Sequence, residues 1–317
     1  MGYYSTTVPA GNSLLVPALV TANDFCGAMT GLVSGSPTST INQTGAGWTP
    51  GQFDNHYVEI TESGSAWEGL VLDIVSNGTD SVVISGDTGA SGFNLNGDEQ
   101  YCIRRHATLG TLFPGGGGFQ GFTDILIRYD SDGSPAIFLW DSNNNRWSNA
   151  NFNENEDDEI VYPGQGLLLV VLTSKTITIG GNDVSTVKTN RTMVNIYGNQ
   201  VVNLVGLMNP LVNQNPLLGD HNPSIPNDPG NVAEIEQVLL GDSGLRTSPF
   251  DPFTDLFLLF SLEGALSTSG LYVIDGGGNI SENGTTVAND DPIRNGAAFL
   301  VVSGSDTFYT QPALADQ

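Results

Sequence analysis

Short apolar runs, separated by segments that contain turn residues such as Gly, Asn, Asp and Ser, follow one another along this 317-residue chain. Stretches such as 56–60 (HYVEI), 81–85 (SVVIS) and 167–171 (LLLVV) are rich in β-branched residues, which favour strands. The 40 glycines fall between such runs and supply turns. Closely spaced strands with few helix signals predict an all-β protein built of antiparallel sheets.

One block of sequence occurs twice. FTDILI at 122–127 returns as FTDLFL at 253–258. Each copy is followed by a strand ending in Asp with a Gly- or Asn-rich turn, then an Asp-Asp pair, then a glycine and an apolar strand. These following blocks span 136–171 and 270–304. Their shared order predicts an internal duplication into two β-sandwich or barrel-like units.

Repeat one is predicted at 1–178 and repeat two at 185–317, and the two differ by insertions. Repeat one carries a small β insert at about 35–112, in which three further strands are predicted. Repeat two carries a Pro-rich loop and a short helix at about 213–252. The helix is predicted because four apolar residues share one face and a pair resembling a capping box stands at the start of the segment. The apolar residues are Val232, Ile235, Val238 and Leu239, and the pair is Asn231 with Glu234.

The charge balance limits the partners. The chain has 34 acidic and 9 basic residues, a net charge of −25. Such a surface repels nucleic acid phosphates, so nucleic acid is excluded as a partner. It favours divalent cations, high salt or a cationic partner. No apolar run reaches about 18 residues, so no membrane span is predicted.

The two cysteines, Cys26 and Cys102, allow two interpretations. A disulfide between them would close a long loop and restrict the unfolded chain. Two small buried thiols are the alternative. An extracellular location favours the disulfide.

Three loops carry oxygen ligands of the kind that Ca²⁺ binds in turns. In the loop at 153–159, five carboxylates within seven residues repel one another unless a cation or salt is present. Ordinary Asx turns that close hairpins explain these loops about as well as a metal site does. The candidate calcium ligands are Asp130 and Asp132; Asp141, Asn143 and Asn145; and Glu156, Asp157 and Asp158.

No catalytic constellation is recognisable, so the sequence predicts a protein that is not an enzyme. GDSG at 241–244 matches the nucleophile tetrapeptide of chymotrypsin-like proteases. None of the three histidines has the sequence context of that family's general base, and a tight turn is the better interpretation. Among the tryptophans, Trp140 is predicted to be a core residue, whereas Trp147 is predicted to be exposed and able to stack on a sugar.

The segments 101–117 (YCIRRHATLGTLFPGGG) and 162–171 (YPGQGLLLVV), together with the start GYYSTTVPAG at 2–11, carry a resemblance. They resemble an uncharacterised family of secreted β-rich proteins found mainly in Verrucomicrobia and related bacteria. The resemblance implies export to the cell surface or the medium, and it implies no catalytic residues.

These observations lead to a ranked set of functions. The first is an extracellular structural protein, a self-assembling subunit of a bacterial surface filament, sheath or surface layer whose main partner is itself. Because copies of net charge −25 repel one another, assembly would need salt or bridging calcium. The alternative is a secreted adhesin or carbohydrate-binding module with an extracellular polysaccharide as partner. A polysaccharide hydrolase ranks third, because it needs a carboxylate pair in a cleft.

Overall fold

The structure is a computed structural model that describes residues 4–17, 19–62, 65–86, 88, 94–180, 184–187, 191–206, 237–239, 250–252, 254–260, 271–282, 286–287, 292–294 and 298–311. Nearly all of its elements are strands, and every strand pair with a defined register is antiparallel. The predicted all-β class is confirmed.

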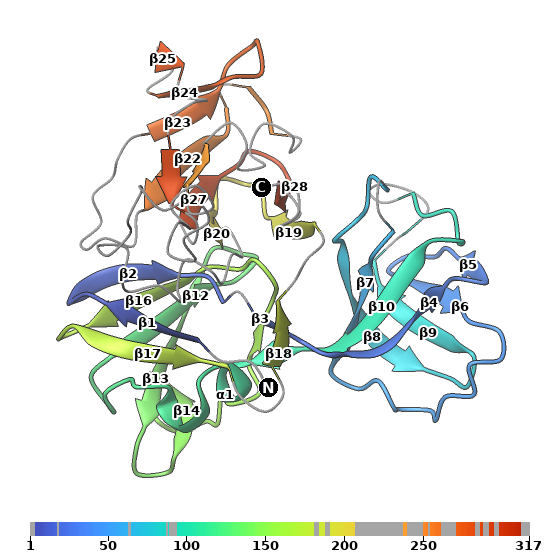
Figure 1. The fold of residues 1–317 in the computed structure, drawn as a ribbon, viewed down its shortest axis with the longest axis horizontal. Coiled ribbons are helices and arrows are strands. Elements are labelled where there is room, and N and C mark those ends of the chain that lie inside the picture. The colour runs from blue at the N-terminus through green and yellow to red at the C-terminus, as the bar shows by residue number, and fades with distance from the viewer. Residues whose placement is uncertain are drawn as a thin grey trace, which may run out of the picture. The chain divides into compact units, whose positions relative to one another are not determined.

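The chain divides into two compact units (Figure 1). Unit 1 consists of Met1–Val20, Ala107–Thr189 and Val194–Gln317, and unit 2 consists of Thr21–His106 and Asn190–Met193. Unit 2 corresponds to the insert predicted at about 35–112, but it begins earlier and ends earlier. It begins earlier because its edge strand lies just after Thr21.

Unit 2 is organised by one sheet of seven strands. The three strands predicted in the insert are present as β7, β8 and β9, and they lie at the centre of the sheet. Tyr57, Ile60 and Tyr101 are among its buried core residues. In sheet order the strands are β4 (Asn23–Ala28), β10 (Gln100–Arg105), β7 (His56–Ile60), β8 (Val71–Asn77), β9 (Ser81–Ser85), β6 (Thr38–Asn42) and β5 (Gly31–Val33).

A disulfide joins the edge strand of this sheet to its neighbour. Cys26 on β4 lies opposite Cys102 on β10, with the Cα atoms 4.1 Å apart, and the two sulfurs are bonded. The predicted disulfide is therefore confirmed, and the alternative of two buried thiols is wrong.

Unit 1 contains a sheet of five strands built around the first FTD block. The central strand is β12 (Ile125–Tyr129), and it pairs with β13 (Pro135–Asp141) and β16 (Leu167–Val171). The outer strands are β14 (Arg146–Asn149) and β2 (Gly11–Leu15). Shorter elements accompany the sheet: the pairs β1 (Tyr4–Val8) with β17 (Lys175–Ile179), β11 (Ala107–Thr108) with β15 (Ile160–Val161), and β3 (Leu19–Thr21) with β18 (Val184–Val187), and the helical turns α1 (Leu109–Leu112) and η1 (Pro114–Gly116).

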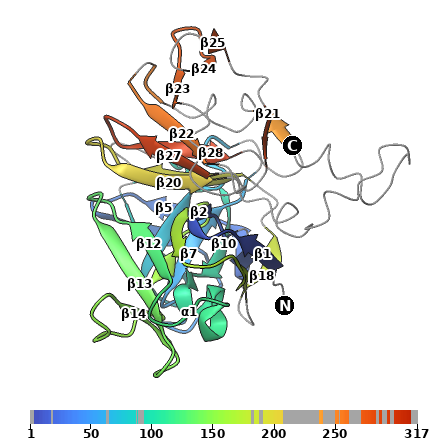
Figure 2. The same cartoon turned by 90° about the vertical axis from the view of Figure 1, so that its left-hand side faces the viewer.

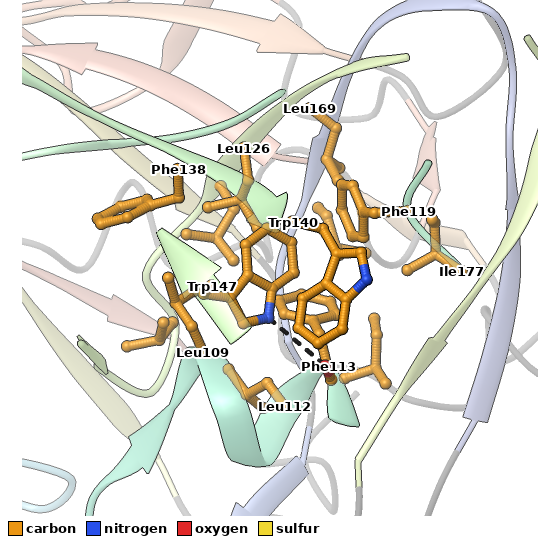
Figure 3. Packing of buried hydrophobic residues seen from close by; sticks show 14 of the residues in the cluster. Leu109, Leu112, Phe113, Phe119, Leu126, Phe138, Trp140, Trp147, Leu169 and Ile177 are labelled. Atoms are coloured by element: carbon orange, nitrogen blue, oxygen red, sulfur yellow. Dashed lines mark hydrogen bonds between the residues drawn. The ribbon is translucent and has the colours of Figure 1, made fainter. Parts of the chain in front are cut away.

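The core beside this sheet is aromatic. Trp140 and Trp147 lie opposite each other on β13 and β14, and their rings pack with Phe113 and Phe119 (Figure 3). The glycine run 115–118 is part of this packing. Gly116 has a φ of +81°, and a Cβ there would lie 2.6 Å from the Trp140 ring, so a side chain at this position would displace the tryptophan.

A second sheet, built around the second FTD block, follows in unit 1. Figure 2 shows β20, β27 and β22 side by side in this sheet. In sheet order its strands are β20 (Val202–Gly206), β27 (Ala298–Val302), β22 (Leu256–Phe260), β23 (Leu271–Ile274), β24 (Ile280–Glu282) and β25 (Thr286–Val287). Two separate pairs belong to the same region: β19 (Thr192–Ile196) with β28 (Thr307–Gln311), and β21 (Gln237–Leu239) with β26 (Pro292–Arg294).

The two sheets of unit 1 share one strand order. The order β2-β16-β12-β13-β14 in the first sheet corresponds to β20-β27-β22-β23-β24 in the second. The pair β1–β17 corresponds likewise to β19–β28, and β11–β15 to β21–β26. A duplication would produce this correspondence. The duplication and its boundaries at 1–178 and 185–317 stay predictions, since unit 1 contains parts of both predicted repeats and the division into units does not follow these boundaries.

The aspartate of each FTD block has the same structural role. The buried carboxylate of Asp124 accepts hydrogen bonds from the backbone N–H groups of Gln120 and Leu172. The buried carboxylate of Asp255 accepts them from Asp251 and Gly304. Each aspartate thus ties the start of a central strand to the end of the neighbouring strand. Phe253, the first residue of the second block, lies outside the described residues.

The prediction of a short helix at 231–240 is wrong for the part of this segment that the structure describes. Gln237–Leu239 forms β21, and Val238 pairs with Ile293 on β26. Pairing with a distant strand has overridden the local helical periodicity, as it readily does for a short segment with a β-branched residue. The remainder of the predicted helix lies outside the described residues.

Across the ranges that the structure describes, no helix combines the length and the apolar character needed to cross a membrane.

Candidate functional site

An open cleft of about 520 Å³ lies in unit 1 where four chain segments meet. The segments are the end of β12 with the turn after it, the start of β15 with the residues that lead into it, the turn between β15 and β16, and the residue that follows β19. Aromatic and acidic side chains dominate its lining: Tyr129, Tyr162, Tyr197, Asp130, Asp158 and Glu159.

Arg128 forms one wall of the cleft and is held by two of the acids. Its Nη2 lies 2.9 Å from Asp130 Oδ1, and its Nη1 lies 2.9 Å from Glu159 Oε2. Nη1 also donates to the backbone oxygen of Ile160, and the guanidinium stands 5.6 Å above the ring centroid of Phe138. These contacts engage the arginine within the protein and fix both carboxylates at the rim.

The turn between β15 and β16 lines another part of the cleft. The backbone N–H of Tyr162 donates to Gln165 Oε1, and the backbone N–H of Gln165 donates to the oxygen of Tyr162. Gln165, which also lines the cleft, forms a bridge with Val205. The PGQG sequence of this turn therefore positions Tyr162 and Gln165 together.

The other two tyrosines stand at strand ends. Tyr129 is the last residue of β12 and packs against an apolar cluster that includes Leu14 and Leu204. Tyr197 directly follows β19, and its side chain is exposed. The backbone N–H of Tyr197 donates to Asn203 Oδ1, which fixes this part of the rim.

The first two predicted calcium loops are closed by their own hydrogen bonds. Asp132 accepts from the N–H and the hydroxyl of Ser134, and these bonds lower the pKa of Asp132. Asp141 accepts from the side-chain amide of Asn144 and from the N–H groups of Asn143 and Asn144, which lowers its pKa. These are the bonds of Asx turns, the alternative left open by the sequence.

Asn143 and Asn145 complete the second loop. Asn143 is exposed, and Asn145 adopts a left-handed backbone conformation with a φ of 52°. Asn tolerates this conformation better than most residues do, so its presence here is explained by the turn.

The third predicted loop belongs partly to the core and partly to the cleft. Asp157 Oδ1 accepts from the backbone N–H of Trp147 at 2.7 Å. Burial, then the charges of Glu159 and Glu154, raise the pKa of Glu156. Asp158 lines the cleft. Of the eight predicted ligands, the structure therefore brings Asp130 and Asp158 to one site and places the other six elsewhere.

Within the described part of the chain, no group of three or more His, Cys, Asp or Glu side chains is arranged to hold a metal ion. Calcium can also take Asn and backbone oxygens, so calcium binding stays a prediction.

Trp147 is not exposed, and the prediction that it could stack on a sugar is wrong. Its exposed fraction is 0 %, and its indole Nε1 donates to the backbone oxygen of Phe113 (Figure 3). The Asn-rich segments that suggested exposure flank the short hairpin strand β14, whose alternation turns Trp147 inward. Trp140 is a core residue, as predicted.

The described histidines are held by aspartates in unit 2. His56 Nε2 lies 2.7 Å from Asp24 Oδ2, and its Nδ1 lies 2.7 Å from the backbone oxygen of Asp54. His106 Nε2 lies 3.3 Å from Asp73. The GDSG tetrapeptide at 241–244 and His221 lie outside the described residues.

The cleft tyrosines and Gln165 were not predicted as site residues. One signal could have found the tyrosines, since each stands at the end of a strand beside a turn, where an aromatic side chain has less sheet to pack on. Fold and site together define an all-β protein of antiparallel sheets with an acidic, tyrosine-lined cleft. Comparisons with known protein families, with curated proteins and with solved structures found no match for this chain. The resemblance to a secreted bacterial family stays a prediction.

Proposed function

We propose that this chain is an extracellular carbohydrate-binding protein whose ligand occupies the cleft lined by Tyr129, Tyr162 and Tyr197. The observation that carries the proposal is the convergence of three tyrosines with carboxylates and one amide. Apolar faces of sugar rings pack on aromatic rings, while carboxylates and amides bond to sugar hydroxyls. The disulfide supports an oxidising, extracellular location.

The architecture suits binding. The cleft residues lie on turns and strand ends that are held by paired strands, and loops on a rigid scaffold commonly carry binding sites. The internal bonds of Arg128 and of the Tyr162–Gln165 turn fix the rim before a ligand arrives. A prearranged site loses less conformational entropy on binding.

The test is calorimetric titration of the full chain with a panel of soluble oligosaccharides. Saturable binding of at least one is expected, and Tyr162→Ala with Tyr197→Ala should weaken it at least about tenfold, the equivalent of about 1.4 kcal/mol. Phe122→Ala is the matched control, since Phe122 is an exposed aromatic of unit 1 outside the cleft lining.

Two results would overturn the proposal: no binding of any oligosaccharide in the panel, or a loss of affinity in the Phe122→Ala control equal to that in the tyrosine variant. Release of new reducing ends during the titration would instead move the protein to the third predicted class, the polysaccharide hydrolases.

Self-assembly into a surface filament, sheath or layer is the second candidate. It is favoured by the edge strand β5, which pairs on one side with β6 and carries Val33 at 60 % exposure. An edge strand of this kind can pair with a strand of another copy. Electron microscopy of the protein with and without a calcium chelator tests this candidate. Dispersed particles in calcium and salt would reject it.

A further inference from the structure

We propose that the cleft selects a protonated amino sugar, a glycan unit with a free amine, over neutral and acidic sugars. This inference rests on the proposed carbohydrate-binding function and adds the charge of the ligand. The observation that carries it is the balance of charges around the cleft, combined with the aromatic lining.

The cleft has more negative than positive charge. Asp130, Asp158 and Glu159 line it together with one cation, Arg128. Three carboxylates against one guanidinium leave two negative charges in excess. The guanidinium is already bonded to Asp130 and Glu159, so it is poorly placed to receive an anionic ligand. A uronic acid or a sulfated sugar would meet like charge here, which costs affinity.

Asp158 is the carboxylate best placed to take a new cation. Its side chain is exposed, and among the described residues no ion pair involves it. Asp130 and Glu159, by contrast, each already face Arg128. A ligand ammonium beside Asp158 would form a charge-assisted hydrogen bond. This bond is stronger than the one that a hydroxyl or an acetamide would form there, because both partners are charged.

The tyrosines add to the same preference. The face of a tyrosine ring carries negative electrostatic potential and attracts a cation placed within about 6 Å of its centre. Three such rings line a cleft that also holds excess carboxylate. A sugar ring packed on one tyrosine can therefore direct its amine toward both kinds of partner. The whole-chain charge of −25 adds long-range attraction for a cationic ligand.

The experiment compares three β-1,4-linked tetramers with the full-length protein at about pH 6, where a primary amine is protonated. The tetramers are those of glucosamine, N-acetylglucosamine and glucose. The glucosamine tetramer is expected to bind at least about tenfold tighter than the other two. Asp158→Asn should lower the affinity ratio between the glucosamine and N-acetylglucosamine tetramers toward one.

Asp54→Asn is the matched control, because it removes the same charge from an exposed site in unit 2. The ratio should stay unchanged in this variant. If both variants lower the ratio equally, general electrostatic attraction explains the preference and the inference is overturned. The inference would also be overturned if oligolysine of the same charge displaced the bound glucosamine tetramer as effectively as the free tetramer does.

The remaining outcomes separate the inference from the proposed function. Equal binding of all three tetramers, or tighter binding of a neutral one, would overturn the amine preference and leave a carbohydrate-binding protein. Binding of none of them, nor of any other oligosaccharide in the panel, would reject the proposed function itself.

Discussion

The ammonium group of Lys175 donates a hydrogen bond to the carboxylate of Asp124, and the two form an ion pair that is almost entirely buried. Asp124 is 0 % exposed, and the Lys175 side chain is 12 % exposed. The matching aspartate of the second sheet, Asp255, accepts from two backbone N–H groups. The strand that corresponds to β17 there, β28, begins with Thr307 instead of a lysine. The aspartates of the two FTD blocks both accept backbone N–H hydrogen bonds, but Asp124 also pairs with a lysine, and a threonine begins the corresponding strand in the region of the second block.

Replacing Lys175 should destabilise the protein. Lys175→Met leaves the carboxylate of Asp124 buried without its counter-charge, which should lower the free energy of unfolding on the order of 3 kcal/mol. Urea denaturation of wild type and variant measures this loss. The double variant Asp124→Asn with Lys175→Met removes both charges and should recover part of it. A single variant within about 0.5 kcal/mol of wild type, the usual range for surface changes, would contradict the prediction.

Trp147→Ala should be among the most damaging substitutions in unit 1. Removing a fully buried indole leaves a cavity beside Phe113 and Phe119 and is expected to cost about 3–5 kcal/mol of stability. Trp147→Phe should cost less, because it retains most of the ring volume. Phe122→Ala, at an exposed aromatic, serves as the control. Equal unfolding midpoints for Trp147→Ala and the control would show that Trp147 is exposed in solution.

The disulfide should stabilise unit 2 in particular. Its cysteines are 76 residues apart, and closing a loop of that length is expected to contribute about 4 kcal/mol by restricting the unfolded chain. Cys26→Ser with Cys102→Ser should therefore speed hydrogen exchange in 21–106 more than in 107–179. A reducing agent should reproduce the effect in wild type and change nothing in the variant. Uniform exchange across both ranges would contradict the prediction.

Glu156 should make stability fall as the pH rises. Its pKa is raised above the ordinary value of 4.5 in the folded protein, so the folded state binds the proton more tightly. That contribution is fully present below pH 4.5 and is lost as the pH rises through the folded-state value. Glu156→Gln should be more stable than wild type at pH 7, by less than about 1 kcal/mol, and equally stable below pH 4.5. Glu62→Gln, an exposed acid in unit 2, controls for the change in net charge.

Local patterns predicted the strands well. The segment of β16 alternates buried and part-exposed residues, and its β-branched and leucine content already indicated a strand. The order of the FTD blocks likewise indicated the order in which the strands of each sheet follow along the chain. Such features depend on residues close in sequence, so they are visible before any tertiary contact is known.

Features that depend on distant contacts were missed. Trp147 was expected to be exposed because it lies between Asn-rich segments, yet its ring is buried by Phe113 and Phe119 from another segment. Val238 fits a helix face, but its pairing with Ile293 makes it part of a strand. The cleft could not be predicted for the same reason. Its residues come from four segments, and only Asp130 and Asp158 had been selected, as calcium ligands.

The position of the cystine has a mechanical consequence for a protein proposed to hold a polymer outside the cell. Cys26 and Cys102 lie close to the two points, Thr21 and His106, where the main segment of unit 2 begins and ends. Tension along the backbone would pass from β4 to β10 directly through the sulfur–sulfur bond. The residues between the cysteines would bear no load. Without that bond they could lengthen the chain by roughly 250 Å, at about 3.3–3.6 Å a residue. The cystine therefore limits how far this part of the chain can be pulled out under load.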